Sequence, residues 1–159
     1  MRLFRDSEVG HVSINGKGCW QSKEFKPTDA SQQCGRGGEG DQSHKSWKEE
    51  SVRASCQAEA VNGKINVRVW TNLDGPPNDE SFGITNVVLT KVMTSATFTF
   101  DNKRDFEGWN CGEITTCGNF GQLCGGFKTT GRERKIQQTF AVSPGEYTVS
   151  LDFIKIDSW

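Results

Sequence analysis

The sequence predicts an all-β fold, a disulfide-supported β-sandwich of the jelly-roll type with about eight strands. Three observations predict this class. Several short segments alternate apolar and polar residues at every second position, which is the period of a strand with one buried face. Turn signals separate these segments at short intervals. Six cysteines accompany a hydrophobic content of only 33%, and no segment has the period of an amphipathic helix.

The first half of the chain contains three predicted strands. Residues 9–14 form the first and end at an Asn-Gly pair, a strong hairpin signal. A polar loop is predicted over residues 27–46. Residues 50–60 then alternate again, and a second Asn-Gly pair leads into residues 64–71. These last two segments form a predicted hairpin.

The second half contributes four more predicted strands. They follow a turn-rich break at residues 74–78, and they cover residues 82–92, 97–101, 135–142 and 147–156. A short joint is predicted at residues 93–95. The Gly-rich and Cys-rich residues 108–126 are predicted to be irregular.

The last strand has the clearest pattern in the chain. Residues 149, 151 and 153 carry apolar side chains on one face. Ile154 and Ile156 are apolar on the opposite parity. The strand is therefore buried on both faces, or a bulge switches its faces.

The six cysteines indicate an extracellular or cell-surface protein whose fold is supported by disulfides. The CxxC pairs that are typical of zinc sites do not occur. Six cysteines allow about 15 pairings. Each half of the chain contains three, so at least one bridge must join the halves if all are paired. The cysteines are Cys19, Cys34, Cys56, Cys111, Cys117 and Cys124.

Charge and hydropathy argue against two classes of partner. The 19 Lys and Arg residues nearly balance the 20 Asp and Glu residues, so no basic excess supports nucleic-acid binding. No segment approaches the roughly 18 consecutive apolar residues of a membrane span. The opening residues lack the apolar centre of a signal peptide, and the chain is interpreted as a mature form or a piece of a longer protein.

Four motifs carry a family resemblance. They are FDNKRDFEGW at residues 100–109, LDFIKIDSW at 151–159, VSING at 12–16 and ESFGITNV at 80–87. They look like landmarks of the galactose-binding-like jelly-roll modules of cysteine-rich surface and secreted proteins in ciliates and other protists. The resemblance covers most of the chain and implies the same fold.

The motifs occur in a rotated order. The family order would place F-x-x-G-W first, then I-D-S-W-D, then V-N-G, and F-G-I-D-N-V near the end. Here the family's start and end are joined through residues 92–96. A circular permutation, a slice of a tandem array, and a subunit whose halves complete different neighbours all fit. The chain is thus one sandwich module over residues 1–159, or two half-modules over residues 1–93 and 96–159.

The third account implies self-association. If residues 86–91 and 96–101 belong to different sandwiches, each subunit presents an incomplete sheet that the next copy fills. Such head-to-tail contacts do not close and generate filaments. If the joint at residues 93–95 folds into a hairpin, the permuted monomer is complete by itself.

No catalytic group is predicted. A Ser or Cys nucleophile needs a base that a third group orients, and only His11 and His44 are available. Calcium is the one predicted cofactor, as a possible structural ion. Its oxygen ligands would come from Asp101, Asn102 and Asp105, although the same residues suit an ordinary acidic turn.

A carbohydrate site is predicted on residues 64–71. Asn66, Arg68 and Trp70 share the polar face of this strand. A sugar could stack on Trp70 while Asn66 and Arg68 bind its hydroxyl groups. Tryptophan is also common as a cover over a sandwich or as an interface anchor.

Together these patterns favour a non-enzymatic extracellular protein, a structural or adhesive building block that polymerises head to tail into a filament by strand or half-domain complementation. The alternative is a lectin-like carbohydrate-binding module on the cell surface.

Overall fold

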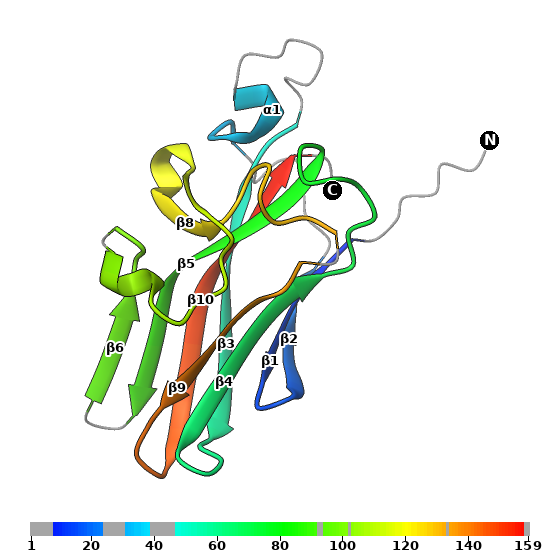
Figure 1. Ribbon diagram of the computed structural model, residues 1–159. Coiled ribbons are helices and arrows are strands. Elements are labelled where there is room, and N and C mark those ends of the chain that lie inside the picture. Colours follow the sequence, from blue (N-terminus) through cyan, green and yellow to red (C-terminus); the bar gives the residue numbers. More distant parts are fainter. Residues whose placement is uncertain are drawn as a thin grey trace, which may run out of the picture.

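Two antiparallel sheets face each other in the computed structural model, which describes residues 8–23, 31–38, 47–91, 94–101, 103–132 and 134–157 (Figure 1). The four-stranded sheet has the order β2-β1-β4-β9. Its strands are β1 (Gly10–Ile14), β2 (Lys17–Gln21), β4 (Lys64–Thr71) and β9 (Ile136–Ala141).

The six-stranded sheet has the order β3-β10-β5-β8-β7, with β6 also paired to β5. Its strands are β3 (Glu50–Glu59), β5 (Glu80–Lys91), β6 (Thr94–Phe98), β7 (Ile114–Thr116), β8 (Gln122–Gly125) and β10 (Glu146–Asp157). The described helical turns are α1 (Gly35–Gly38), η3 (Lys103–Phe106) and η4 (Gly118–Phe120). The predicted all-β sandwich is confirmed.

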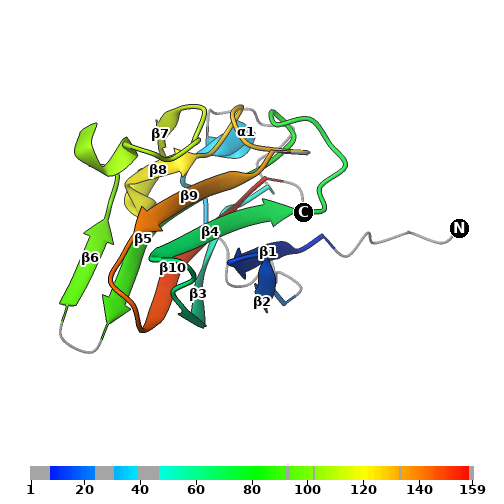
Figure 2. The same ribbon diagram turned by 60° about the horizontal axis from the view of Figure 1, so that its bottom comes forward.

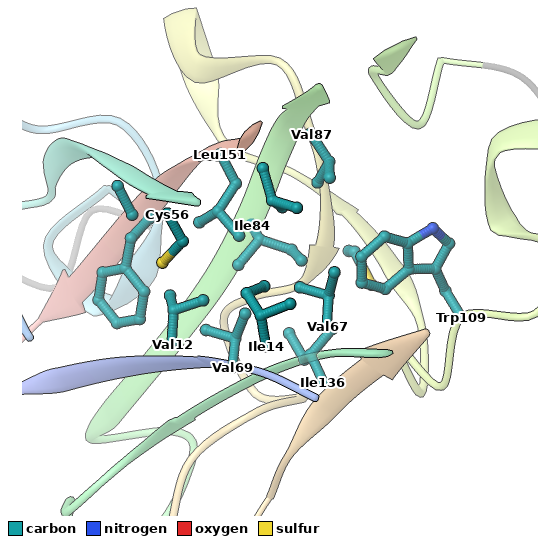
Figure 3. Close-up of a cluster of buried hydrophobic side chains, with 14 of the residues drawn as sticks. Val12, Ile14, Cys56, Val67, Val69, Ile84, Val87, Trp109, Ile136 and Leu151 are labelled. Carbon is teal, nitrogen blue, oxygen red and sulfur yellow. The ribbon is translucent and has the colours of Figure 1, made fainter. Parts of the chain in front are cut away.

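The core lies between the two sheets, where both contribute their alternating apolar residues (Figure 3). Phe82 of β5 and Phe153 of β10 stack at 5.6 Å between ring centroids. β10 is central because it pairs with β3 on one side and with β5 on the other. Other fully buried residues of this core include Val12, Ile65, Val67, Val69, Ile84, Phe100, Ile136 and Leu151.

The C-terminal end of β10 is buried on both faces. Ile154 and Ile156 form a second apolar cluster with Leu123 and Cys117, on the side away from the main core. β10 keeps one register with β3. Its pairing with β5 shifts between Ser150 and Asp152, where two residues of β5 lie opposite Leu151, so the extra residue belongs to β5. Residues 153–157 of β10 are all buried, so the apolar parity change reflects burial on both faces.

Three disulfides use all six cysteines. Cys19–Cys56 connects β2 with β3 and therefore joins the two sheets. Cys111–Cys124 closes the segment before β8. Cys34–Cys117 joins the two halves of the chain, as the distribution of the cysteines requires.

One predicted pairing and two predicted boundaries were wrong. The segments at residues 50–60 and 64–71 do not form a hairpin, because β3 pairs with β10 in one sheet and β4 pairs with β1 and β9 in the other. Residues 108–126 are not irregular throughout, because they contain the short elements β7, η4 and β8. β8 pairs with both β5 and β7, and the Cys111–Cys124 bridge stabilises this region. β6 ends at Phe98 and not at residue 101. It ends there because the Asp105 carboxylate accepts hydrogen bonds from the N–H groups of Thr99 and Phe100 (3.2 and 3.1 Å), which turns these residues away from a strand ladder.

β5 and β6 pair with each other within one chain, Lys91 opposite Thr94 and Val87 opposite Phe98. Both strands therefore belong to the six-stranded sheet of the same molecule. Several residues named in the sequence interpretation lie outside the described residues: His44, Met93, Asn102 and Trp159.

Candidate functional site

The outer edge of β3 is the candidate interaction site. β3 ends the six-stranded sheet, and among the described residues it pairs only with β10. The N–H of Ala60 donates to the carbonyl of Gly145, its partner in the register (2.9 Å). Antiparallel ladder bonds alternate along a strand, so the even-numbered residues of β3 bond to β10. The N–H and C=O groups of the odd-numbered residues therefore point to the free edge.

Two contacts cover the ends of this edge. At one end, Ser31 and Glu49 exchange two backbone hydrogen bonds of 2.9 and 2.8 Å, which form an isolated bridge. At the other end, the side-chain amide of Asn15 donates to the carbonyl of Glu59 (2.9 Å). Both covered residues are odd-numbered, which agrees with the parity derived from Ala60.

Between these contacts the backbone of β3 is open. The outward N–H and C=O groups belong to Ser51, Arg53, Ser55 and Gln57, and no described residue bonds to them. We call residues 51–57 the open segment. It extends about 24 Å at about 3.4 Å per residue. An exposed ladder of this kind is a template on which another strand can pair.

The side chains of the open segment leave this template accessible. Arg53 lies across the outer face of the sheet, because its guanidinium donates to Asp152 (3.0 Å), Ser150 (2.8 Å) and the carbonyl of Asn86 (2.9 Å). Its charge is thus directed inward over β10 and β5. Residues 51–57 contain neither proline nor lysine, the residues that commonly protect an edge strand.

The edge of β9 differs from this arrangement. Val142 donates to the carbonyl of Gly63 (2.8 Å), so the odd-numbered residues of β9 face its free edge. There the Asn110 side chain accepts from the N–H of Gln137 (2.5 Å), and the Asn110 N–H donates to the Gln137 carbonyl (3.3 Å). The N–H of Thr139 bonds to the neighbouring Gln138 side chain (2.8 Å). Asn110 and Gln138 therefore cover Gln137 and the N–H of Thr139 on this edge.

A groove of about 400 Å³ lies where the open segment ends. It separates the β1–β2 hairpin from the C-terminal end of β3. Ile14, Ala58 and Val61 supply apolar lining, and Val61 is 54% exposed. Glu59 and Glu146 line the same groove and stand directly opposite each other in the β3–β10 register. Like charges in this arrangement oppose strand pairing.

The predicted carbohydrate residues lie together on the outer face of β4. All three are half-buried. The Asn66 side chain donates to Thr139 (2.8 Å), and the Nε of Arg68 donates to Gln137 (3.3 Å). The terminal nitrogens of Arg68 have no hydrogen-bond partner within the described part of the chain.

Trp70 completes this face by stacking on His11 of β1, with 5.2 Å between ring centroids and 14° between ring planes. Partial burial lowers the pKa of His11, so the imidazole is neutral over a wider pH range. A neutral, flat pair of rings beside a partly unpaired guanidinium is a surface that could contact a sugar.

The predicted calcium ligands show a competing structural role. Oδ2 of Asp105 already accepts the N–H groups that end β6, and Asp101 is exposed. A second acidic group, Glu8 with Asp74 and Glu80, has ligand atoms within 4.8 Å of one another. Glu80 accepts the N–H of Gly75 at 2.6 Å, so it too stabilises a turn. Calcium binding stays a prediction.

A buried charged cluster, which the sequence interpretation missed, fixes the segment that carries Ser31. Glu49 is fully buried, and its Oε2 accepts the N–H groups of Gln33 (2.6 Å) and Cys34 (3.0 Å). Burial raises the pKa of Glu49, although these two bonds oppose the rise. Lys155 of β10 donates to the carbonyl of Lys48 (2.7 Å), and burial lowers its pKa.

Asp157, at the end of β10, extends the cluster. Its carboxylate accepts the N–H of Arg36 at 3.1 Å. Burial raises the pKa of Asp157 to about 6, against the opposing effects of this bond and of Lys155. A side chain at Gly35 would collide with the Asp157 carboxylate, and the φ of +77° there also favours glycine. The sequence pattern could not reveal this cluster because its members are far apart along the chain.

Comparisons of this chain with protein-family models, with curated proteins and with solved structures found no match. The resemblance to galactose-binding-like modules of protist proteins therefore stays a prediction. No helix in the described ranges has the length and apolar character to cross a membrane. Three disulfides are compatible with a secreted or extracellular protein.

Proposed function

We propose that this protein is a non-enzymatic building block of an extracellular or cell-surface assembly, in which copies join when a strand of one copy pairs with the open segment of the next. The proposal rests on the outward N–H and C=O groups of Ser51, Arg53, Ser55 and Gln57, to which no described residue bonds. Strand addition gives affinity through main-chain hydrogen bonds. Two disulfides support the role in an oxidising environment, because Cys19–Cys56 anchors β3 and Cys34–Cys117 anchors the segment that carries Ser31.

The site differs from the one that the sequence suggested. The sequence interpretation placed complementation at the junction of residues 86–91 and 96–101. Because β5 and β6 pair in one molecule, we assign the contact to the edge of β3. Copies still join head to tail in this proposal, and only the strand that forms the contact differs from the sequence interpretation.

A proline at position 55 tests the proposal. Ser55→Pro removes an N–H that faces the free edge, so it leaves the β3–β10 ladder intact. Sedimentation velocity under non-reducing conditions should show the unchanged chain as oligomers and Ser55→Pro as a monomer. Ser55→Ala keeps the N–H and should assemble normally. A monomeric unchanged chain, or full assembly of a folded Ser55→Pro protein, would overturn the proposal.

Carbohydrate binding is the second candidate function, and the His11–Trp70 stack beside Arg68 supports it. A sugar ring would lie on Trp70, and its hydroxyl groups would accept hydrogen bonds from the terminal nitrogens of Arg68. A glycan array tests it directly. Trp70→Ala should lose the signal, whereas Val61→Ala, far from this face in the groove beside β3, should keep it. An array without any bound glycan rules this candidate out.

A further inference from the structure

We propose that the strand filling the open segment is β6 of a neighbouring copy, so that the six-stranded sheet continues from one molecule into the next. This inference rests on the proposed function and names the partner surface. It is carried by the length and direction of β6, by its position in the sheet, and by the contact that blocks the alternative pairing of two β3 strands.

Symmetric pairing of two β3 strands is blocked by Ser31. The centre of the open segment is Ala54, and a two-fold pairing about this residue would place Glu59 of the second copy opposite Glu49. Ser31 already occupies that place through its two backbone bonds to Glu49. The same collision would occur at the other end of the pair. The open segment therefore requires a strand shorter than β3.

β6 meets the requirement on length and composition. It has five residues, TSATF, and extends about 17 Å at about 3.4 Å per residue, whereas the seven residues of the open segment extend about 24 Å. It contains no charged residue and no proline, the two features that usually prevent pairing at an edge. In the described part of the sheet β6 pairs only with β5, so its other side has no strand beside it.

The position and direction of β6 also agree. Both ribbon views place β5 and β10 between β6 and β3, so these strands form opposite edges of one sheet (Figures 1 and 2). Each neighbouring pair on this path is antiparallel, so β6 runs opposite to β3. When copies follow one another without inversion, β6 of one meets β3 of the next in antiparallel orientation, the more stable type of pairing.

This contact joins two different surfaces and is therefore head-to-tail. Head-to-tail contacts generate an open chain of subunits unless the rotation between copies closes a ring. Because β-sheets twist, successive copies would be rotated and the product would be a helical filament. Its backbone would be a continuous sheet that runs through every subunit.

Two complementary variants test the inference. Ser55→Pro blocks the β3 edge. For β6 the blocking variant is Ala96→Pro or Thr97→Pro, because ladder bonds alternate and one of these two N–H groups faces away from β5. The variant chosen is the one whose three disulfides and thermal unfolding match the unchanged chain. Masses are measured for each variant alone and for an equal mixture.

Each variant alone should be monomeric, and the mixture should form a species of twice the monomer mass and nothing larger. In that dimer, β6 of the Ser55→Pro chain pairs with the intact open segment of β3 in the other chain. If the β6 variant assembles as well as the unchanged chain, or dimerises alone through β3, or if the mixture stays monomeric, β6 is not the partner. These outcomes leave the proposed function standing, because it is contradicted only by a monomeric unchanged chain or by assembly of a folded Ser55→Pro protein.

Discussion

β3 and β9 are both edge strands of this sandwich, yet β3 has an open segment whereas part of the β9 edge is covered. At β9, the Asn110 side chain and backbone bind both outward groups of Gln137, and the Gln138 side chain binds the N–H of Thr139. At β3, the corresponding groups of residues 51–57 bind no described residue. The covers at Ser31 and Asn15 stop at the two ends of this segment.

The difference shows that this fold can protect an edge with ordinary amide side chains. Such protection is common where strand pairing would cause aggregation. The open segment of β3 has the same exposure and lacks the protection. We therefore interpret its open state as a property of an interaction surface.

The largest effect is expected when the Cys34–Cys117 bridge is removed. This bridge anchors the segment that carries the Ser31 cover, and it closes a sequence separation of 83 residues. Cys34→Ser with Cys117→Ser should lower the free energy of unfolding by about 4–5 kcal/mol in the chain-entropy model. Denaturant unfolding under non-reducing conditions measures the loss.

The matched control is Cys111→Ser with Cys124→Ser, which opens a separation of only 13 residues and should cost about 3 kcal/mol. It leaves the Ser31 segment anchored. Equal losses in both pairs would contradict the loop-length argument.

The second effect concerns the covered part of the β9 edge. Asn110→Ala removes the acceptor for the Gln137 N–H and the donor to the Lys135 carbonyl, so the free energy of unfolding should fall by about 1–2 kcal/mol. The uncovered β9 edge should also add concentration-dependent association, which light scattering detects. Asn110→Asp keeps the acceptor and should associate less. Unchanged scattering in Asn110→Ala would mean that Asn110 does not protect this edge.

A smaller effect is expected from pH. The pKa of Asp157 is raised to about 6 by burial, so the folded state binds a proton more tightly than the unfolded chain, where an aspartate titrates near 3.9. This proton linkage stabilises the fold at low pH and is lost as the pH rises through about 6. Stability should therefore rise from pH 7 to pH 5, by at most about 1.4 kcal/mol per pH unit.

Asp157→Asn should flatten this dependence, because the amide does not titrate. Unfolding curves at several pH values compare the two proteins. If the free energy of unfolding changes with pH equally in both proteins, another group, such as buried Glu49, controls the pH dependence of stability.

Periodicity predicted most of the fold because each long strand has its own alternating pattern. β3, β4, β5, β9 and β10 follow it, and the apolar parity change in β10 reflects real burial on both faces. β7 and β8 could not be predicted in this way, since three and four residues are too few to show a period. They form because β8 pairs with both β5 and β7, and the Cys111–Cys124 disulfide holds β8.

The candidate site was harder to predict than the fold. The sequence placed Asn66, Arg68 and Trp70 on one face, and they do lie together on β4. It could not show that Asp105 ends β6, because that role depends on local turn geometry. An open edge is equally hidden, because it depends on which strands become neighbours and on a distant bond such as that of Ser31 to Glu49.

Hydrogen–deuterium exchange at the two edges tests the central claim most directly. In the dispersed protein, the amides of Ser51, Arg53, Ser55 and Gln57 should exchange quickly, and the amide of Gln137 more slowly because Asn110 binds it. On assembly, the four β3 amides should become protected while Gln137 stays unchanged. Assembly that leaves these four amides fast would contradict the claim that copies join through the open segment of β3.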